Sequence, residues 1–71
     1  MVKHICAMTA KCGYWGSYGV GDSEEAARKK ARKELGEKPA KVQMFTCDVM
    51  DGHKLVITQT ITGLQWWTEP V

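Results

Sequence analysis

Residues 22–36, DSEEAARKKARKELG, decide the fold because they carry both the start signal and the stop signal of an α-helix. Either Asp22 or Ser23 can accept the first free backbone N–H groups, and Glu25 stands three residues after Asp22, as in a capping box. Gly36 supplies the left-handed residue at which helices commonly end. We therefore expect a helix that ends just before this glycine.

One face of this expected helix is apolar and small. Its members recur every four residues, at Ala27, Ala31 and Leu35. This spacing predicts a stripe that is buried against the rest of the domain. Because two of the three side chains are alanine, we expect the helix to lie close against a sheet and to bury a modest area.

Two strands are expected before the helix. Residues 2–12 alternate apolar and polar side chains, which is the period of a half-buried strand. Residues 14–20 predict a second strand, in which Tyr14 and Tyr18 share one face and Trp15 lies on the other. The glycines within this second strand favour a bulge or a strong twist.

Two more strands are expected after the helix. Residues 41–49 and 53–62 flank the turn sequence Asp51-Gly52, so we expect them to pair as a hairpin. A two-residue turn and a three-residue loop at 50–52 are both open to this sequence, and the longer loop is preferred because it gathers the apolar residues on one face. That register pairs Cys47 with Leu55 and Phe45 with Ile57.

The order β-β-α-β-β predicts an α+β fold. We expect a single domain over residues 1–71, with one antiparallel sheet of four to five strands and the helix packed across one face. The fifth strand depends on residues 64–67, which follow Gly63 and form either a short strand or an extended tail. A chain of 71 residues is close to the lower limit for a self-sufficient core, so binding or self-association would add stability.

The cysteines and histidines predict no catalytic residues, no metal site and no cofactor. Three cysteines are an odd number, which argues against a disulfide framework and favours reduced thiols. Neither C-x-x-C nor H-x-x-H spacing occurs, and a zinc site needs three or four converging ligands. A cysteine nucleophile needs a nearby base, which His4 or His53 can supply only through the fold. We therefore do not expect an enzyme.

The chain also carries no sign of a membrane location. It has no apolar run of 18 residues, and the apolar residues after Met1 are interrupted too early for a signal peptide. We therefore expect a cytoplasmic protein without membrane partners.

The helix carries the first group of candidate partner-binding residues. The formal net charge is only +2, but five cations lie within residues 28–33. Exposed cations in this number indicate a footprint on nucleic acid or on an acidic protein surface. The alternative is a solvated helix face with supporting pairs at i, i+4, such as Glu24–Arg28 and Glu25–Lys29. The candidate residues in this group are Arg28, Lys29, Arg32 and Lys33.

Large aromatic side chains form the second group. Tryptophan and tyrosine anchor many interfaces, and a small protein that exposes them has reason to meet a partner. Trp66 and Trp67 are adjacent, so in an extended segment one can complete the core while the other is exposed. The alternative is that the rings cap a thin core from outside. The candidate residues in this group are Tyr14, Trp15, Tyr18, Trp66 and Trp67.

In size and in β-β-α-β-β order, the chain resembles the small proteins with which phages and other mobile elements block host defences, anti-CRISPR proteins among them. The resemblance covers most of the chain but includes no sequence motif, so it implies no site residues. It implies docking on a CRISPR effector complex, with the cationic helix on an acidic surface or the sheet in a nucleic-acid channel.

We therefore expect a non-enzymatic protein that docks on a larger protein or ribonucleoprotein, as an inhibitor of a host nucleic-acid-processing or defence complex. One alternative is direct nucleic-acid binding, in which Tyr14, Trp15 and Tyr18 stack on bases while helix cations meet phosphates. A second alternative is a homo-oligomer, such as a homodimer, in which sheet edges or the C-terminal tryptophans pair with a second copy.

Overall fold

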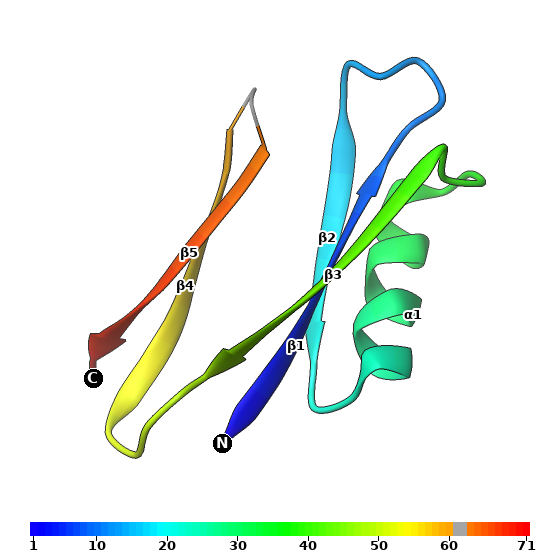
Figure 1. Cartoon of the computed structure of the whole chain (residues 1–71). Helices are drawn as coiled ribbons and strands as arrows, with labels where there is room; N and C mark the ends of the chain where they lie inside the picture. The colour runs from blue at the N-terminus through cyan, green and yellow to red at the C-terminus, as the bar shows by residue number, and fades with distance from the viewer. Residues whose placement is uncertain (61–62) are drawn as a thin grey trace.

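The computed structural model describes residues 1–60 and 63–71 and confirms the α+β class (Figure 1). One helix and five strands are present in these ranges. They are β1 (Val2–Thr9), β2 (Gly16–Gly21), α1 (Glu24–Leu35), β3 (Lys41–Asp48), β4 (His53–Thr60) and β5 (Gly63–Pro70). Residues 64–67, for which the sequence left a strand and a tail as alternatives, thus belong to the full strand β5. The last two residues of the predicted strand 53–62 lie outside the described residues.

The strands form two antiparallel sheets, so the prediction of a single sheet of four to five strands is wrong. β1 lies in the middle of a three-stranded sheet with the order β2-β1-β3, and β4 pairs with β5 as a separate hairpin. Figure 1 shows α1 on one side of the three-stranded sheet and the β4–β5 hairpin on the other. The molecule therefore has three layers, with the larger sheet in the centre.

The predicted hairpin of residues 41–49 with 53–62 is also wrong. Cys47 lies opposite Lys3 of β1, and Leu55 lies opposite Thr68 of β5. The turn before β4 does form, but it carries the chain from one sheet to the other. All eight residues of β3 pair with β1, and all eight of β4 pair with β5. Each strand thus pairs over its full length with a strand other than the one predicted, and the edges of β3 and β4 that would form the predicted hairpin are not paired with each other.

The helix is capped as its sequence indicates. Of the two candidate caps, Ser23 is the one used: its Oγ accepts a hydrogen bond from the Ala26 N–H at 3.1 Å. Asp22 instead accepts a hydrogen bond from Lys3 Nζ at 2.6 Å, which ties the start of the helix to β1. Gly36 ends the helix in the left-handed conformation, with φ at 73°.

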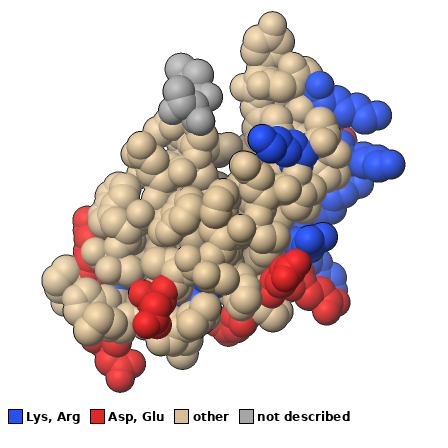
Figure 2. Space-filling view, viewed as in Figure 1, with Lys and Arg blue, Asp and Glu red and all other residues tan. Residues whose placement is uncertain are grey.

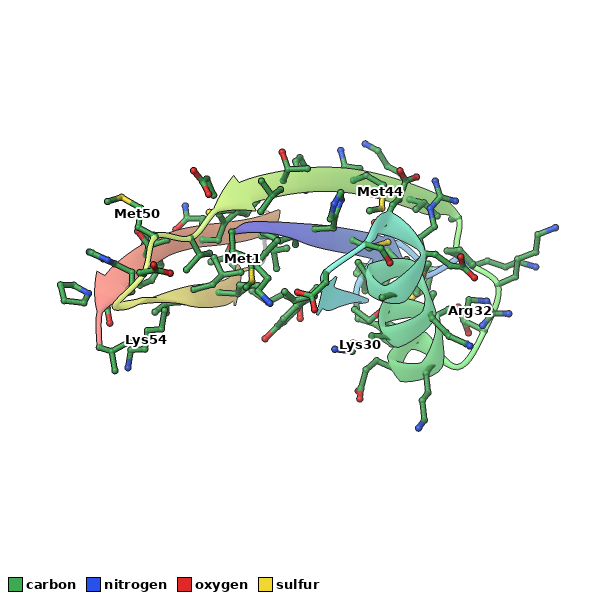
Figure 3. All side chains as sticks on the ribbon, turned by 90° about the horizontal axis from the view of Figure 1, so that it is seen from below. Met1, Lys30, Arg32, Met44, Met50 and Lys54 are labelled. Carbon is green, nitrogen blue, oxygen red and sulfur yellow. The ribbon has the colours of Figure 1, made fainter. Side chains whose placement is uncertain are left out.

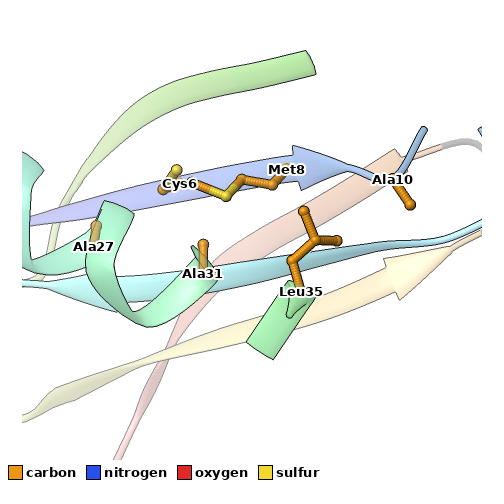
Figure 4. Close-up of a cluster of buried hydrophobic side chains, with 6 residues drawn as sticks. All are labelled: Cys6, Met8, Ala10, Ala27, Ala31 and Leu35. Carbon is orange, nitrogen blue, oxygen red and sulfur yellow. The ribbon is translucent and has the colours of Figure 1, made fainter. Parts of the chain in front are cut away.

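The predicted apolar stripe of α1 is confirmed, and it packs on the even-numbered side of β1. The cluster consists of Cys6, Met8, Ala10, Ala27, Ala31 and Leu35 (Figure 4). β2 pairs with β1 without interruption, so its glycines do not mark a bulge. Gly19 instead permits close approach, because an added Cβ would lie 2.5 Å from the backbone nitrogen of Ala31.

A second apolar layer lies between the larger sheet and the hairpin. Ile5 is completely buried there, and its partner in the register is Phe45. The rings of Phe45 and Trp66 pack with their centroids 4.8 Å apart and a tilt of 44° between their planes. Trp66 is half-buried in this layer, whereas Trp67 points away from it and is exposed. The two tryptophans therefore divide between core and surface, as expected for neighbours on a strand.

Candidate functional site

The cations of α1 lie on its solvent side, and all five are exposed. Arg28 forms the expected i, i+4 pair with Glu24, at 3.1 Å between Nη2 and Oε1, whereas the expected Glu25–Lys29 pair does not form. The other four helix cations form no ion pair with any described residue. Figure 3 shows Arg32 projecting from the helix away from the sheet, whereas Lys30 lies on the side of the helix next to β2. Arg28 is thus partly neutralised, and the remaining cations are available to a partner.

Further cations lie near the end of the helix. Lys38 and Lys41 stand where the chain leads into β3, and Lys11 follows β1, whose last residue Thr9 lies opposite Lys41 in the register. Figure 2 shows lysine and arginine side chains gathered on this side of the molecule. We name this region the basic surface and define it as Lys11, Lys29, Lys30, Arg32, Lys33, Lys38 and Lys41.

Carboxylates gather mainly at the opposite end of the strands. The ends of β3 and β5 and the start of α1 all lie there, because β3 ends opposite Val2 and β2 ends opposite His4. The acidic residues at this end are Asp22, Glu24, Glu25, Asp48, Asp51 and Glu69. Two carboxylates do lie near the basic surface, Glu34 and Glu37, against its seven cations. The molecule is therefore electrically polar along its strands.

A cleft of about 750 Å³ opens at the basic end. It lies between the loop that joins β1 to β2 and the end of the hairpin at Thr60 and Gly63, and Figure 2 shows the surface hollowed there. The end of β1 and the start of β3 contribute its floor. Its lining residues include Trp15, Lys41, Gln43, Phe45, Gln59 and Leu64.

One hydrogen bond divides this cleft from a smaller hollow beside it. Gln59 Nε2 donates to the carbonyl oxygen of Gly16 at 3.0 Å, which joins the hairpin to the start of β2. The second hollow, of about 390 Å³, is lined by Trp15, Tyr18, Glu34 and Gln59 among others. Trp15 and Gln59 line both, so the two hollows form a continuous concave surface around the tryptophan.

The structure brings three of the five predicted aromatic residues together. Tyr14 and Trp15 line the larger cleft, and Tyr18 lines the smaller one with Trp15. Their exposed fractions are 94%, 48% and 36%. The strand containing Tyr18 begins at Gly16, so the predicted start at residue 14 was two residues early and Tyr14 lies in the loop.

The C-terminal tryptophans do not join this group. Trp66 is occupied by its packing on Phe45. Trp67 is 43% exposed on the outer face of the hairpin, where its Nε1 donates to Glu69 Oε1 at 3.0 Å. The prediction missed the amide side chains of the cleft, because isolated glutamines on strands have no sequence pattern that distinguishes them from solvated positions.

The larger cleft offers little acid–base chemistry. None of its described lining residues is a histidine, cysteine, aspartate or glutamate, and Lys41 is the one charged side chain among them. Elsewhere, Cys6 lies beneath the helix, where burial raises the pKa of its thiol, while Cys12 is exposed. Within residues 1–60 and 63–71, no three histidine, cysteine or acidic side chains converge to hold a metal ion.

Comparison of the chain with protein-family models, curated proteins and solved structures found no match. The search for membrane-spanning segments likewise found no described helix with the length and apolarity to cross a bilayer. The function must therefore be inferred from the geometry of this chain's own residues.

Proposed function

We propose that this protein is a non-enzymatic binding protein that docks through its basic surface on a larger partner with an acidic face. The observation that carries the proposal is the uneven distribution of charge, with seven cations and two carboxylates towards one end of the strands and six carboxylates and three cations towards the other. Such a distribution orients a protein as it approaches a charged partner and raises the rate of association.

The size of the molecule is consistent with this role. A standard protein interface buries about 800 Å² on each partner. The accessible surface of the whole chain is 5065 Å², so such an interface takes roughly one sixth of it.

The partner class in this proposal is a protein or ribonucleoprotein complex that processes nucleic acid, and the protein inhibits it by occupying a working surface. The resemblance in size and element order to phage-encoded inhibitors supports this class. The lining of the larger cleft also favours binding over catalysis, because its described residues supply neither a nucleophile with a base nor paired carboxylates.

The proposal is tested with two variants that lower the net charge equally. The basic-surface variant carries Lys29→Gln, Arg32→Gln and Lys33→Gln. The control variant carries Lys54→Gln, Met50→Glu and Val71→Glu, all exposed positions at the acidic end of the strands. Figure 3 shows Lys54 far from the cations of the helix. Each set lowers the net charge by three, so any difference between the variants reports where the charge lies.

The first measurement is the salt concentration at which each protein elutes from immobilised heparin, used as a polyanionic probe. We expect the control variant to elute near the wild type and the basic-surface variant to elute at clearly lower salt. Equal elution of the two variants would show that the position of the cations is irrelevant, and the docking proposal would be wrong.

The second measurement is interference with a targeted plasmid in cells that express one of a panel of CRISPR effector complexes. We expect the wild type and the control variant to relieve interference by at least one complex and the basic-surface variant to fail. Unchanged interference across the panel would reject the inhibitor class while leaving the docking result to the heparin measurement.

A further inference from the structure

The concave surface around Trp15 has the size and the lining of a site for flat, polar ligands. Its two hollows measure about 750 and 390 Å³, and small-molecule sites in proteins are typically about 300–1,000 Å³. They meet at the Gln59–Gly16 hydrogen bond and share the indole ring of Trp15. The surface is therefore long enough for a chain of linked units to pass along it.

Trp15 is held in position by its backbone while its ring is left without a partner. The carbonyl oxygen of Trp15 accepts a hydrogen bond from the N–H of Ala10 at 2.9 Å, and the Ala10 carbonyl accepts one from Gly13 at 3.0 Å. These bonds close the loop between β1 and β2. Among the described residues, the indole N–H donates no hydrogen bond and the ring stacks on no other ring. A half-exposed indole ring on an anchored backbone can serve as a stacking platform.

Two amide side chains supply polar recognition beside the platform. Gln43 is exposed on the floor of the cleft, and its side-chain amide forms no hydrogen bond with a described residue. Gln59 uses one N–H on Gly16 and keeps its side-chain carbonyl oxygen free to accept. Amides present both donors and acceptors, which suits the edges of unpaired bases.

The charge around the cleft selects an anionic ligand. Lys41 lines the larger cleft itself, and the described lining of that cleft contains no carboxylate, whereas the cations of α1 lie on the opposite side of the larger sheet. Glu34 is the one acidic residue in the smaller hollow. Stacking rings, amide groups and a flanking cation together form the combination that binds single-stranded nucleic acid.

We infer that the cleft binds an unpaired segment of nucleic acid, with a base stacked on Trp15 and a backbone phosphate beside Lys41. This inference rests on the proposed function, because it names the part of a nucleic-acid-processing complex that the protein contacts. An acidic peptide satisfies the same charges, so competition between polyglutamate and the oligonucleotide separates the two ligands.

The experiment measures fluorescence anisotropy of labelled dT12 and rU12 against the purified protein at low salt. The variant is Trp15→Ala, and the matched control is Trp67→Ala, since the two tryptophans are similarly exposed at 48% and 43%. Loss of one stacked base weakens binding about tenfold or more. We expect that loss for Trp15→Ala and unchanged affinity for Trp67→Ala, with circular dichroism confirming that both variants fold.

Two further measurements distinguish the ligand class. The logarithm of the affinity for a single strand falls with the logarithm of salt concentration, with a slope of about 0.7 per phosphate contact. Lys41→Gln should therefore show a shallower slope, while Trp15→Ala should keep the wild-type slope. Polyglutamate should compete poorly with dT12, and a 12-base-pair duplex should bind more weakly than either single strand.

The outcomes separate the two proposals. Equal binding by Trp15→Ala and the wild type, equally strong binding of duplex, or effective competition by polyglutamate would overturn the nucleic-acid site. Docking through the basic surface would still stand if the basic-surface variant lost heparin retention and its control variant did not. Absence of binding to both oligonucleotides would also overturn the inference, whatever the heparin measurement gives.

Discussion

Gly19 of β2 faces the helix, and replacing it with alanine tests how closely the two elements pack. A Cβ at this position would lie nearest to the carbonyl oxygen of Ala27, 2.5 Å from the nitrogen of Ala31 and 2.8 Å from the Cβ of Lys30. The two nearest atoms belong to the helix backbone, so no side-chain rotation can relieve the contact. Ordinary van der Waals contact begins near 3.4 Å, so the helix must move outward by roughly 1 Å.

That movement strains the contacts that hold the helix on the sheet. Ser17 Oγ donates to the carbonyl oxygen of Ala31 at 2.6 Å, and this buried hydrogen bond would lengthen. Overpacking of this kind costs about 1–3 kcal/mol, and the reduced freedom of the unfolded chain returns less than about 1 kcal/mol. We expect Gly19→Ala to lower the free energy of unfolding by about 2 kcal/mol, which corresponds to a loss of roughly 8–16 °C in Tm for a domain of this size.

The measurement is urea unfolding followed by far-ultraviolet circular dichroism, with Thr58→Ala on the exposed face of the hairpin as the control. The control should change the free energy of unfolding by less than about 0.5 kcal/mol. If Gly19→Ala were as stable as the control, the helix would not lie as close to β2 as the structure indicates, and the packing argument would be refuted.

Two other predictions concern titratable groups. Cys12 should react with a thiol reagent in the folded protein, whereas Cys6, whose pKa is raised by burial, should react only on unfolding. Equal rates of modification of the two cysteines, measured by mass spectrometry, would contradict the burial of Cys6. The hydrogen bond from Lys3, together with the charge of Lys3, lowers the pKa of the Asp22 carboxyl below its ordinary value of 3.8. The ionised carboxylate therefore stabilises the fold above about that pH, and this stabilisation is lost as the pH falls through the folded pKa. The unfolding free energies of wild type and Asp22→Asn should therefore differ at pH 7 and converge in acid, and a difference that is independent of pH would count against the pairing.

The helix was predictable from sequence because its determinants are local. The cap at Ser23, the stop at Gly36 and the four-residue spacing of the apolar stripe all lie within 15 residues of chain. Strand pairing is different, because the partner of a strand is chosen from the whole chain. The turn at Asp51-Gly52 predicted a change of direction correctly but did not determine whether the flanking strands bond to each other. They do not, because β3 pairs with β1 and β4 pairs with β5 in two separate sheets.

The candidate site was predictable only in part for the same reason. Exposed cations follow from the composition of an amphipathic helix, and the outward position of Lys29, Arg32 and Lys33 needed no knowledge of the fold. The cleft exists because the hairpin crosses to the far side of the sheet, so residues such as Gln43 and Gln59 meet only through the unpredicted topology. Which C-terminal tryptophan is exposed likewise depends on the face of β5 that meets Phe45.

The crossing of the hairpin also determines what sets the aperture of the cleft. In the described residues no backbone hydrogen bond joins the β4–β5 ladder to the larger sheet, so the gap between them is not fixed by ladder spacing. It is held by the packing of Phe45 on Trp66 and by the hydrogen bond from the Gln59 side chain to the Gly16 carbonyl oxygen. A change of side-chain volume at position 66, which does not line the cleft, would therefore alter the size of ligand that fits while leaving the identity of every lining residue unchanged.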